Sequence, residues 1–203
     1  MVDKLLRGPK EQLLRPVAFR LPRSVSPLTI TLVAFGAGLG AALAIWQQAY
    51  WSGLALWLIN RVLDGLDGTF ARVYGKQTDF GGYLDMVLDT VIYAAIPTAL
   101  VLAQPSPAAW LSLVALLASF YINGASWMYL AALLEKCSQG AYARGELTTI
   151  TMPGGIIEGS ETVAFYTLFL LIPDASVPLF WTMALLVLAT ACQRLVWARR
   201  GLA

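Results

Sequence analysis

Histidine is missing altogether from the 203 residues of this chain, and charged residues make up only 13% of it. The first absence excludes any mechanism that moves protons through an imidazole. The second argues against a soluble globular protein, in which about 25% of residues are charged and cover the surface. Cysteine is scarce as well. Cys137 and Cys192 could form at most one bridge, so the chain is not a disulfide scaffold.

Apolar residues dominate instead. They make up 58% of the chain, and the mean hydropathy is +0.67. This composition excludes an intrinsically disordered chain. The 14 lysines and arginines are nearly balanced by 12 aspartates and glutamates, which argues against a broadly basic surface. No nucleic-acid partner is therefore expected.

Long charge-free stretches predict membrane-spanning helices. Residues 24–60 and 90–134 contain no charged side chain, and residues 162–193 contain only Asp174. A spanning helix needs about 20 mostly apolar residues, so each of the first two stretches has room for two spans. Polar or proline-rich breaks divide all three stretches. We therefore expect an all-α integral membrane protein with six transmembrane helices, at residues 27–47, 51–73, 80–103, 107–134, 157–172 and 177–198.

The basic residues predict the orientation of these spans. They lie before the first span, around the second and fourth connections, and at the end of the last span, whereas the other three connections contain none. The positive-inside rule then places both termini and these two connections in the cytoplasm. The chain is thus expected to be a multi-pass protein of the inner (cytoplasmic) membrane.

The first 26 residues are too polar to span a membrane. Leucines such as Leu5 and Leu13 alternate with basic residues such as Lys10 and Arg15, a pattern typical of an amphipathic helix on an anionic membrane surface. A solvated basic tail is the alternative interpretation. Two regions are expected: an N-terminal amphipathic juxtamembrane segment at 1–26, in contact with membrane lipids, and a six-helix transmembrane domain at 27–203.

Four aspartates flank the second connection. Asp64 and Asp67 are three residues apart near the end of the second span, and Asp85 and Asp89 are four apart near the start of the third. Each pair shares a helix face, and consecutive antiparallel spans bring the pairs together. Ionisable residues inside spans are functional by default, and gathered carboxylates need a compensating cation. Oxygen ligands alone favour Mg²⁺, Mn²⁺ or Ca²⁺ over zinc.

The alternative is that these aspartates cap helices or form salt bridges at helix ends. For Asp79 we prefer that alternative, with Thr78 and Asp79 starting the third span. The small residues between the aspartates permit close helix packing, or let a base or phosphate reach the backbone. Arg72 is either a cytoplasmic anchor or a bidentate phosphate ligand.

Together these residues resemble the motif of the CDP-alcohol phosphatidyltransferase family. The motif is D-x-x-D-G-x-x-A-R, eight residues, and G-x-x-x-D-x-x-x-D, and it is met by Asp64, Asp67, Gly68, Ala71, Arg72, Gly81, Asp85 and Asp89. The resemblance implies a transferase of phospholipid synthesis. Such an enzyme moves a phosphatidyl group from a CDP-lipid, such as CDP-diacylglycerol, to a small alcohol and releases CMP. The resemblance also implies a homodimer.

The same resemblance implies a role for each motif residue. Two Mg²⁺ or Mn²⁺ ions are expected, the first held by Asp64, Asp67 and Asp85 and the second by Asp64, Asp85 and Asp89. Asp89 would also be the general base that takes the acceptor's proton. Contacts to the CDP-lipid are expected from Gly68, Ala71, Arg72, Thr78 and Gly81, and from the segment Pro27, Leu28, Thr29 and Ile30.

The acceptor alcohol is harder to infer. Family members that use a phosphorylated acceptor carry extra basic residues in the fourth and fifth spans, and here only Arg194, in the last span, matches a family arginine. Glu158 and Glu161 stand at the start of the fifth span, where those relatives have arginines. This pattern favours a neutral or amine-bearing alcohol. Equally, both glutamates are suited to cap the fifth helix.

Two other functions are compatible with paired membrane aspartates. An intramembrane prenyltransferase also binds a diphosphate with aspartates, but such chains are longer and lack the G-x-x-A-R segment. A divalent-cation transporter would place polar residues through the whole membrane depth, whereas the four aspartates here lie near one edge.

Overall fold

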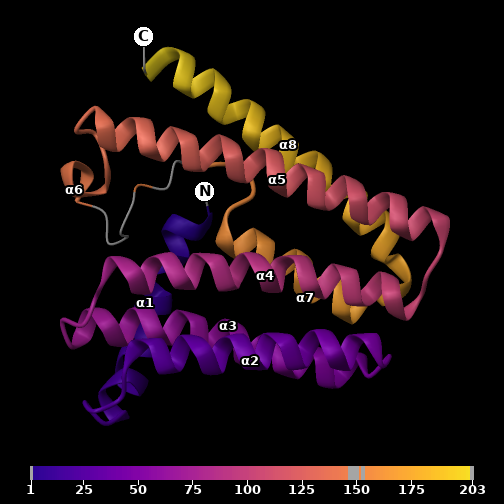
Figure 1. Ribbon diagram of the computed structural model, residues 1–203, viewed down its shortest axis with the longest axis horizontal. Coiled ribbons are helices and arrows are strands. Elements are labelled where there is room, and N and C mark those ends of the chain that lie inside the picture. The colour runs from indigo at the N-terminus through magenta and orange to yellow at the C-terminus, as the bar shows by residue number, and fades with distance from the viewer. Residues whose placement is uncertain (1, 146–150, 152–153, 202–203) are drawn as a thin grey trace.

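Eight α-helices and one short 3₁₀ helix form the regular structure of the chain in a computed structural model that describes residues 2–145, 151 and 154–201 (Figure 1). No strand occurs within those residues, so the expected all-α class is confirmed. The elements are α1 Val2–Arg20, α2 Pro27–Trp46, α3 Tyr50–Val73, α4 Asp79–Ala103, α5 Pro107–Lys136, α6 Ala141–Arg144, α7 Gly159–Leu171, the 3₁₀ helix η1 Pro173–Ala175, and α8 Ser176–Gly201.

Local signals fix where the helices begin. Proline occupies the first turn of α2 and of α5, where its missing N–H costs nothing. The Thr78 hydroxyl caps α4 by accepting a hydrogen bond from the Gly81 amide at 3.0 Å. The six helices expected from the sequence all exist, with bounds that agree to within three residues. The one-turn helix α6 was not expected.

Four of these helices are long and apolar enough to cross a membrane: α2, α4, α5, and the continuous segment Pro173–Arg199 that contains α8. Helix α3 carries four charged side chains. Helix α7 has 13 residues, and at 1.5 Å per residue it extends only about 20 Å against a hydrocarbon core of about 30 Å. Length and composition therefore support four spans directly.

The helices pack in two groups. Helices α5 and α8 lie side by side along one edge of the molecule, and α2 packs against both α3 and α4 on the opposite side (Figure 1). Helix α7 contacts both α3 and α8 and so joins the groups. At this junction the Trp57 ring of α3 stacks on Tyr166 of α7 with 5.3 Å between ring centroids, and Phe169 packs edge-on against Phe180 of α8. One apolar core thus connects six helices.

Helix α1 packs on α3 beside this core. Ala18 of α1 is fully buried in a second cluster with Leu66 and Phe70 of α3. Leu13 and Val17, four residues apart on another face of α1, are exposed, whereas the Phe19 ring packs edge-on against Tyr74. The helix therefore has one packed apolar face and one unpacked apolar face.

Gly38 is where α2 comes closest to its neighbours. A Cβ atom on Gly38 would lie 2.6 Å from Ile92 Cδ1 of α4 and 3.1 Å from Asn60 Nδ2 of α3. Glycine is therefore required for these three helices to meet at this depth. Gly36, two residues earlier, has nothing within 4 Å of the same position.

We expect Gly38→Val to destabilise the protein by about 1–3 kcal/mol, because the added methyl groups overlap Ile92 and displace Asn60. The matched change Gly36→Val adds the same side chain to the same helix without a clash and should leave stability unchanged. Thermal unfolding of both variants in detergent tests this. Equal melting temperatures would contradict the close packing at Gly38.

Candidate active site

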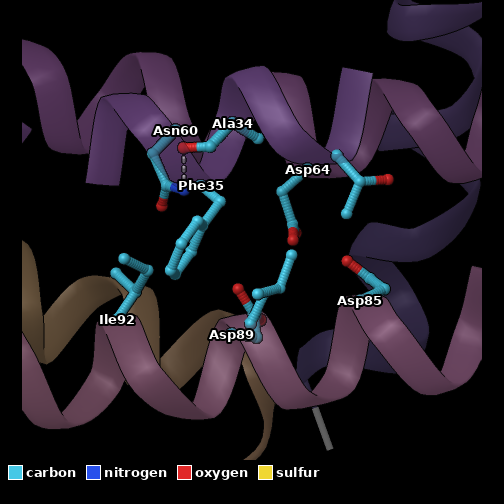
Figure 2. A pocket seen from close by; sticks show the side chains of 9 residues that line it. Ala34, Phe35, Asn60, Asp64, Asp85, Asp89 and Ile92 are labelled. Carbon is cyan, nitrogen blue, oxygen red and sulfur yellow. Dashed lines mark hydrogen bonds between the residues drawn. The ribbon is translucent and has the colours of Figure 1, made fainter. Parts of the chain in front are cut away.

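A recess between α2, α3 and α4 gathers three of the four motif aspartates. Its volume is about 200 Å³, counted with the open space at its mouth. Asp64 of α3 and Asp85 and Asp89 of α4 direct their side chains into the space between the two helices (Figure 2). The full lining is Thr31, Ala34, Phe35, Asn60, Asp64, Asp85, Leu88, Asp89 and Ile92.

The recess lies inside the bundle rather than at its end. Asp89 is ten residues beyond Asp79, the first residue of α4, so it lies about 15 Å along the helix axis from that end. Its apolar lining residues Phe35 and Ile92 belong to or pack against the main core. Charges at this depth are partly removed from water and need specific partners.

Asp67 differs from the other three aspartates in its surroundings. Its side chain is 5% exposed, and it accepts a hydrogen bond of 2.6 Å from the hydroxyl of Thr31 on α2. Thr31 was not predicted as a site residue, although it directly follows the segment expected to contact the nucleotide. The Thr31–Asp67 contact ties α2 to α3 beside the recess.

Arg61 is the second residue at the recess that was not predicted as a site residue. It is 8% exposed and forms a two-pronged ion pair with Asp89, with Nη2 2.5 Å from Oδ1 and Nη1 3.1 Å from Oδ2. Nη1 also lies 3.8 Å from Asp64 Oδ2. The available signal was its position three residues before Asp64, on the same helix face.

Carboxylates are the ligands that Mg²⁺ and Mn²⁺ prefer, and no cysteine or histidine lines the recess, so the donor chemistry fits a hard divalent ion. In the part of the chain that the structure describes, no three acidic or cysteine side chains are grouped closely enough to hold one ion. Arg61 engages both oxygens of Asp89. The side chains would have to turn toward a shared ion to ligate it.

The residues expected to contact the CDP-lipid lie at the end of α3, at the start of α2, and at the start of α4. Arg72 lies along α3 over Gly68 and donates a 3.0 Å hydrogen bond from Nε to Glu11 of α1. Lys76, in the turn after α3, donates to the backbone oxygen of Val25 at 3.0 Å, which brings the turn beside the start of α2. The remaining members are Ala71 on α3, Thr78 and Gly81 at the start of α4, and Pro27, Leu28, Thr29 and Ile30 in the first turn of α2.

The three residues expected near the acceptor have other contacts, and none of them lines the recess. Glu158 and Glu161 form a capping box at the start of α7, so the capping interpretation is the one observed. Arg194 of α8 is buried and donates a 2.5 Å hydrogen bond from Nη1 to Asn123 of α5.

Comparison with known proteins agrees with the motif. The chain is 36% identical over 155 residues to the inner membrane protein YnjF of Escherichia coli K12, covering 73% of this chain and 71% of that protein. It is 31% identical over 209 residues to the phosphatidylinositol phosphate synthase of Corynebacterium glutamicum, covering 96% and 88%.

Solved structures share the fold. The phosphatidylinositol phosphate synthase PgsA1 of Mycobacterium tuberculosis with CDP-DAG bound superposes with a TM-score of 0.69 at 22% identity, covering 91% of this chain and 92% of that one. Its complex with manganese and citrate gives a TM-score of 0.68 at 23% identity, covering 90% and 87%.

The sequence model described as CDP-alcohol phosphatidyltransferase matches residues 24–193, which contain the whole aspartate motif and the recess. The chain therefore belongs to the CDP-alcohol phosphatidyltransferase family and is an enzyme that transfers a phosphatidyl group to an alcohol.

Proposed function

We propose that the donor is CDP-diacylglycerol or a closely related CDP-lipid and that the acceptor is a small alcohol, with CMP as the second product. The observation that carries this is the recess on which Asp64, Asp85 and Asp89 converge from two helices. A solved relative that shares the fold holds CDP-DAG. The family match favours this reaction over prenyl transfer or cation transport.

Two divalent ions, Mg²⁺ or Mn²⁺, would be held at this site. We assign Asp64, Asp67 and Asp85 to one ion and Asp64, Asp85 and Asp89 to the other. Support comes from the oxygen-only donor set and from the relative whose structure contains manganese. When bound, such ions supply positive charge that stabilises the pyrophosphate leaving group.

The chain's own residues then position the reactants. Asp89, with 26% of its side chain exposed, faces the recess and would accept the proton of the acceptor hydroxyl. The alcohol oxygen forms a bond to the lipid-side phosphorus while the bond from that phosphorus to CMP breaks. Arg72 would exchange its Glu11 partner for a phosphate oxygen of the CDP group, and Gly68 leaves space for that approach. Attack in line is chiefly a matter of orientation.

In the membrane, α2, α3, α4, α5 and α8 would each span the bilayer, and the shorter α7 would complete a sixth crossing together with the residues that flank it. Both termini and the recess would then lie on the cytoplasmic side of the inner membrane. The distribution of basic residues supports this orientation, and a relative is named an inner membrane protein. Helix α1, within residues 1–26, would lie on the lipid surface with Leu13 and Val17 inserted, beside the transmembrane domain at 27–203. A homodimer is proposed on the family resemblance alone.

The acceptor is proposed to carry no phosphate group. The start of α7 has the acidic residues Glu158 and Glu161, and the buried Arg194 already donates to Asn123. A negative potential here would favour an amine-bearing or neutral alcohol over an anionic one. The glutamates would act through this potential, because their side chains cap α7.

Purified protein with Mn²⁺ and CDP-diacylglycerol should release CMP when a suitable alcohol is present, and Asp89→Asn should lower the rate by at least about a hundredfold because the base is lost. Binding of the CDP-lipid should weaken far less than turnover, since asparagine keeps an acceptor for Arg61 and the other three aspartates remain. Chromatographic CMP assays and labelled-lipid binding measure the two effects.

Asp79→Asn is the matched control for this variant. Asp79 begins α4 and is exposed outside the recess, so its loss should leave CMP release unchanged. If Asp89→Asn unfolds, and the loss of CMP release is no larger than the loss of folded protein, the interpretation of Asp89 as a capping or salt-bridge residue would be favoured. The absence of metal-dependent CMP release from the unaltered protein with every alcohol tested would reject the proposed reaction.

A screen of acceptor alcohols tests the proposal that the acceptor carries no phosphate group. We expect serine, ethanolamine, choline or inositol to support CMP release and the phosphorylated acceptors glycerol phosphate and inositol phosphate not to, because the latter add negative charge beside Glu158 and Glu161. Release with inositol phosphate alone would instead align this chain with the relatives named phosphatidylinositol phosphate synthase.

A further inference from the structure

The guanidinium of Arg61 is held on every side. Nε donates to Asn60 Oδ1 at 2.8 Å, Nη1 donates to the Tyr93 hydroxyl at 2.9 Å, and the fork formed by Nη1 and Nη2 meets Asp89. The guanidinium carbon lies 4.7 Å from the ring centroid of Trp57 and 5.2 Å from that of Tyr93. Arg61 cannot swing away from Asp89 without losing several of these contacts at once.

The partners of Arg61 are themselves fixed by other helices. Asn60 donates from Nδ2 to the backbone oxygen of Ala34 on α2 at 2.8 Å (Figure 2). Trp57 donates to Thr167 of α7 at 3.2 Å, and the Tyr93 ring packs edge-on against Tyr166 of α7 at 5.2 Å. Four helices thus combine to place one positive charge beside the recess. A simple membrane anchor would need none of this support.

Asp89 keeps binding capacity despite this pairing. A carboxylate has about four lone-pair sites, and the fork of Arg61 uses one on each oxygen. The remaining sites are available on the recess side, where Asp89 is part of the lining. Asp89 can therefore hold Arg61 and receive a proton from an acceptor at the same time, in an orientation that Arg61 dictates.

The charge of Arg61 also acts on the recess directly. Its guanidinium contacts Asp89 and lies 3.8 Å from Asp64, so it offsets part of the negative potential created by the four aspartates. A divalent ion that approaches the same carboxylates is repelled by this fixed charge. The protein thus carries a built-in cation at the place where ions are proposed to bind.

From this geometry we infer that Arg61 is a positioning residue for Asp89 and a fixed cation that weakens divalent-ion binding at the recess. The inference rests on the proposed function, because it assigns Arg61 a part in that reaction. The inference predicts that two measured quantities, the affinity for divalent ions and the rate of turnover, depend on different features of Arg61. If Arg61 were merely structural, its substitution would change both quantities together. Loss of the Arg61 charge tightens ion binding, whereas loss of the fork slows turnover.

The test compares Arg61→Gln, Arg61→Lys and the unaltered protein, each as full chain in detergent. Free Mn²⁺ is measured by electron paramagnetic resonance during titration with Mn²⁺ alone, and CMP release is measured separately. We expect Arg61→Gln to bind Mn²⁺ at least about fivefold more tightly, because the opposing charge is gone. Its CMP release should fall at least about tenfold, because the general base is no longer oriented.

Arg61→Lys distinguishes the two roles. Lysine keeps the charge but is a point donor that cannot form the fork, so Mn²⁺ affinity should stay near that of the unaltered protein while turnover falls. Arg199→Gln is the matched control: it removes the same charge from an exposed position near the end of α8 and should change neither quantity. Folding is checked for all variants by gel filtration and thermal unfolding.

If Arg61→Gln binds Mn²⁺ no more tightly than the unaltered protein does, the proposed role of Arg61 as a fixed cation is overturned. Should Arg61→Gln fail to fold, Arg61→Lys still decides the positioning role, because full turnover in that variant contradicts it. Failure of the proposed function looks different: the unaltered protein then releases no CMP at all, whereas the Mn²⁺ titrations still report on the charge of Arg61.

Discussion

Compensation of buried negative charge is the constraint on which this structure depends. An ionised carboxylate removed from water costs several kcal/mol unless partners replace its hydration. In this structure the motif aspartates have different partners that replace part of this hydration. Asp89 has the fork of Arg61, Asp67 has the Thr31 hydroxyl, and Asp64 lies near the same guanidinium. These differences in partners distinguish Asp64, Asp67 and Asp89, although all three carry the same side chain.

This constraint explains why the core and the site cannot be separated. The rings of Trp57, Tyr93 and Tyr166 form the centre of the apolar core, and two of them also hold Arg61. Ile92 fills the core beside Gly38 and lines the recess as well. Packing at this level therefore sets the orientation of Asp89. Precise helix contacts serve chemistry here as much as stability, because displacement by an ångström can cost much of the rate.

The sequence predicted what local patterns encode. The charge-free stretches predicted six helices, and all six are present. The spacing of the aspartates predicted that they would converge, and Asp64, Asp85 and Asp89 do line one recess. Contacts between distant residues escaped prediction. Thr31 meets Asp67 from 36 residues away, Arg61 meets Asp89 from 28, and Glu11 takes Arg72 from 61. No periodicity reveals such pairs, because they depend on the rotation of one helix against another. The capping box at α7 is local, and the sequence did foresee it as an alternative.

The chain has no histidine, and the charges around the recess explain how the proposed reaction could proceed without one. Four aspartates against one arginine leave the recess strongly negative, so bound cations and an anionic substrate favour one another there. Two divalent ions alone would reverse the sign, and the pyrophosphate of a CDP-lipid would return the site close to neutrality. Ion binding and donor binding are then energetically coupled, as linkage requires. Within such a balance the Asp89 carboxylate would take the proton, because Arg61 holds it in place beside the recess. An imidazole would add nothing that this set of charges lacks.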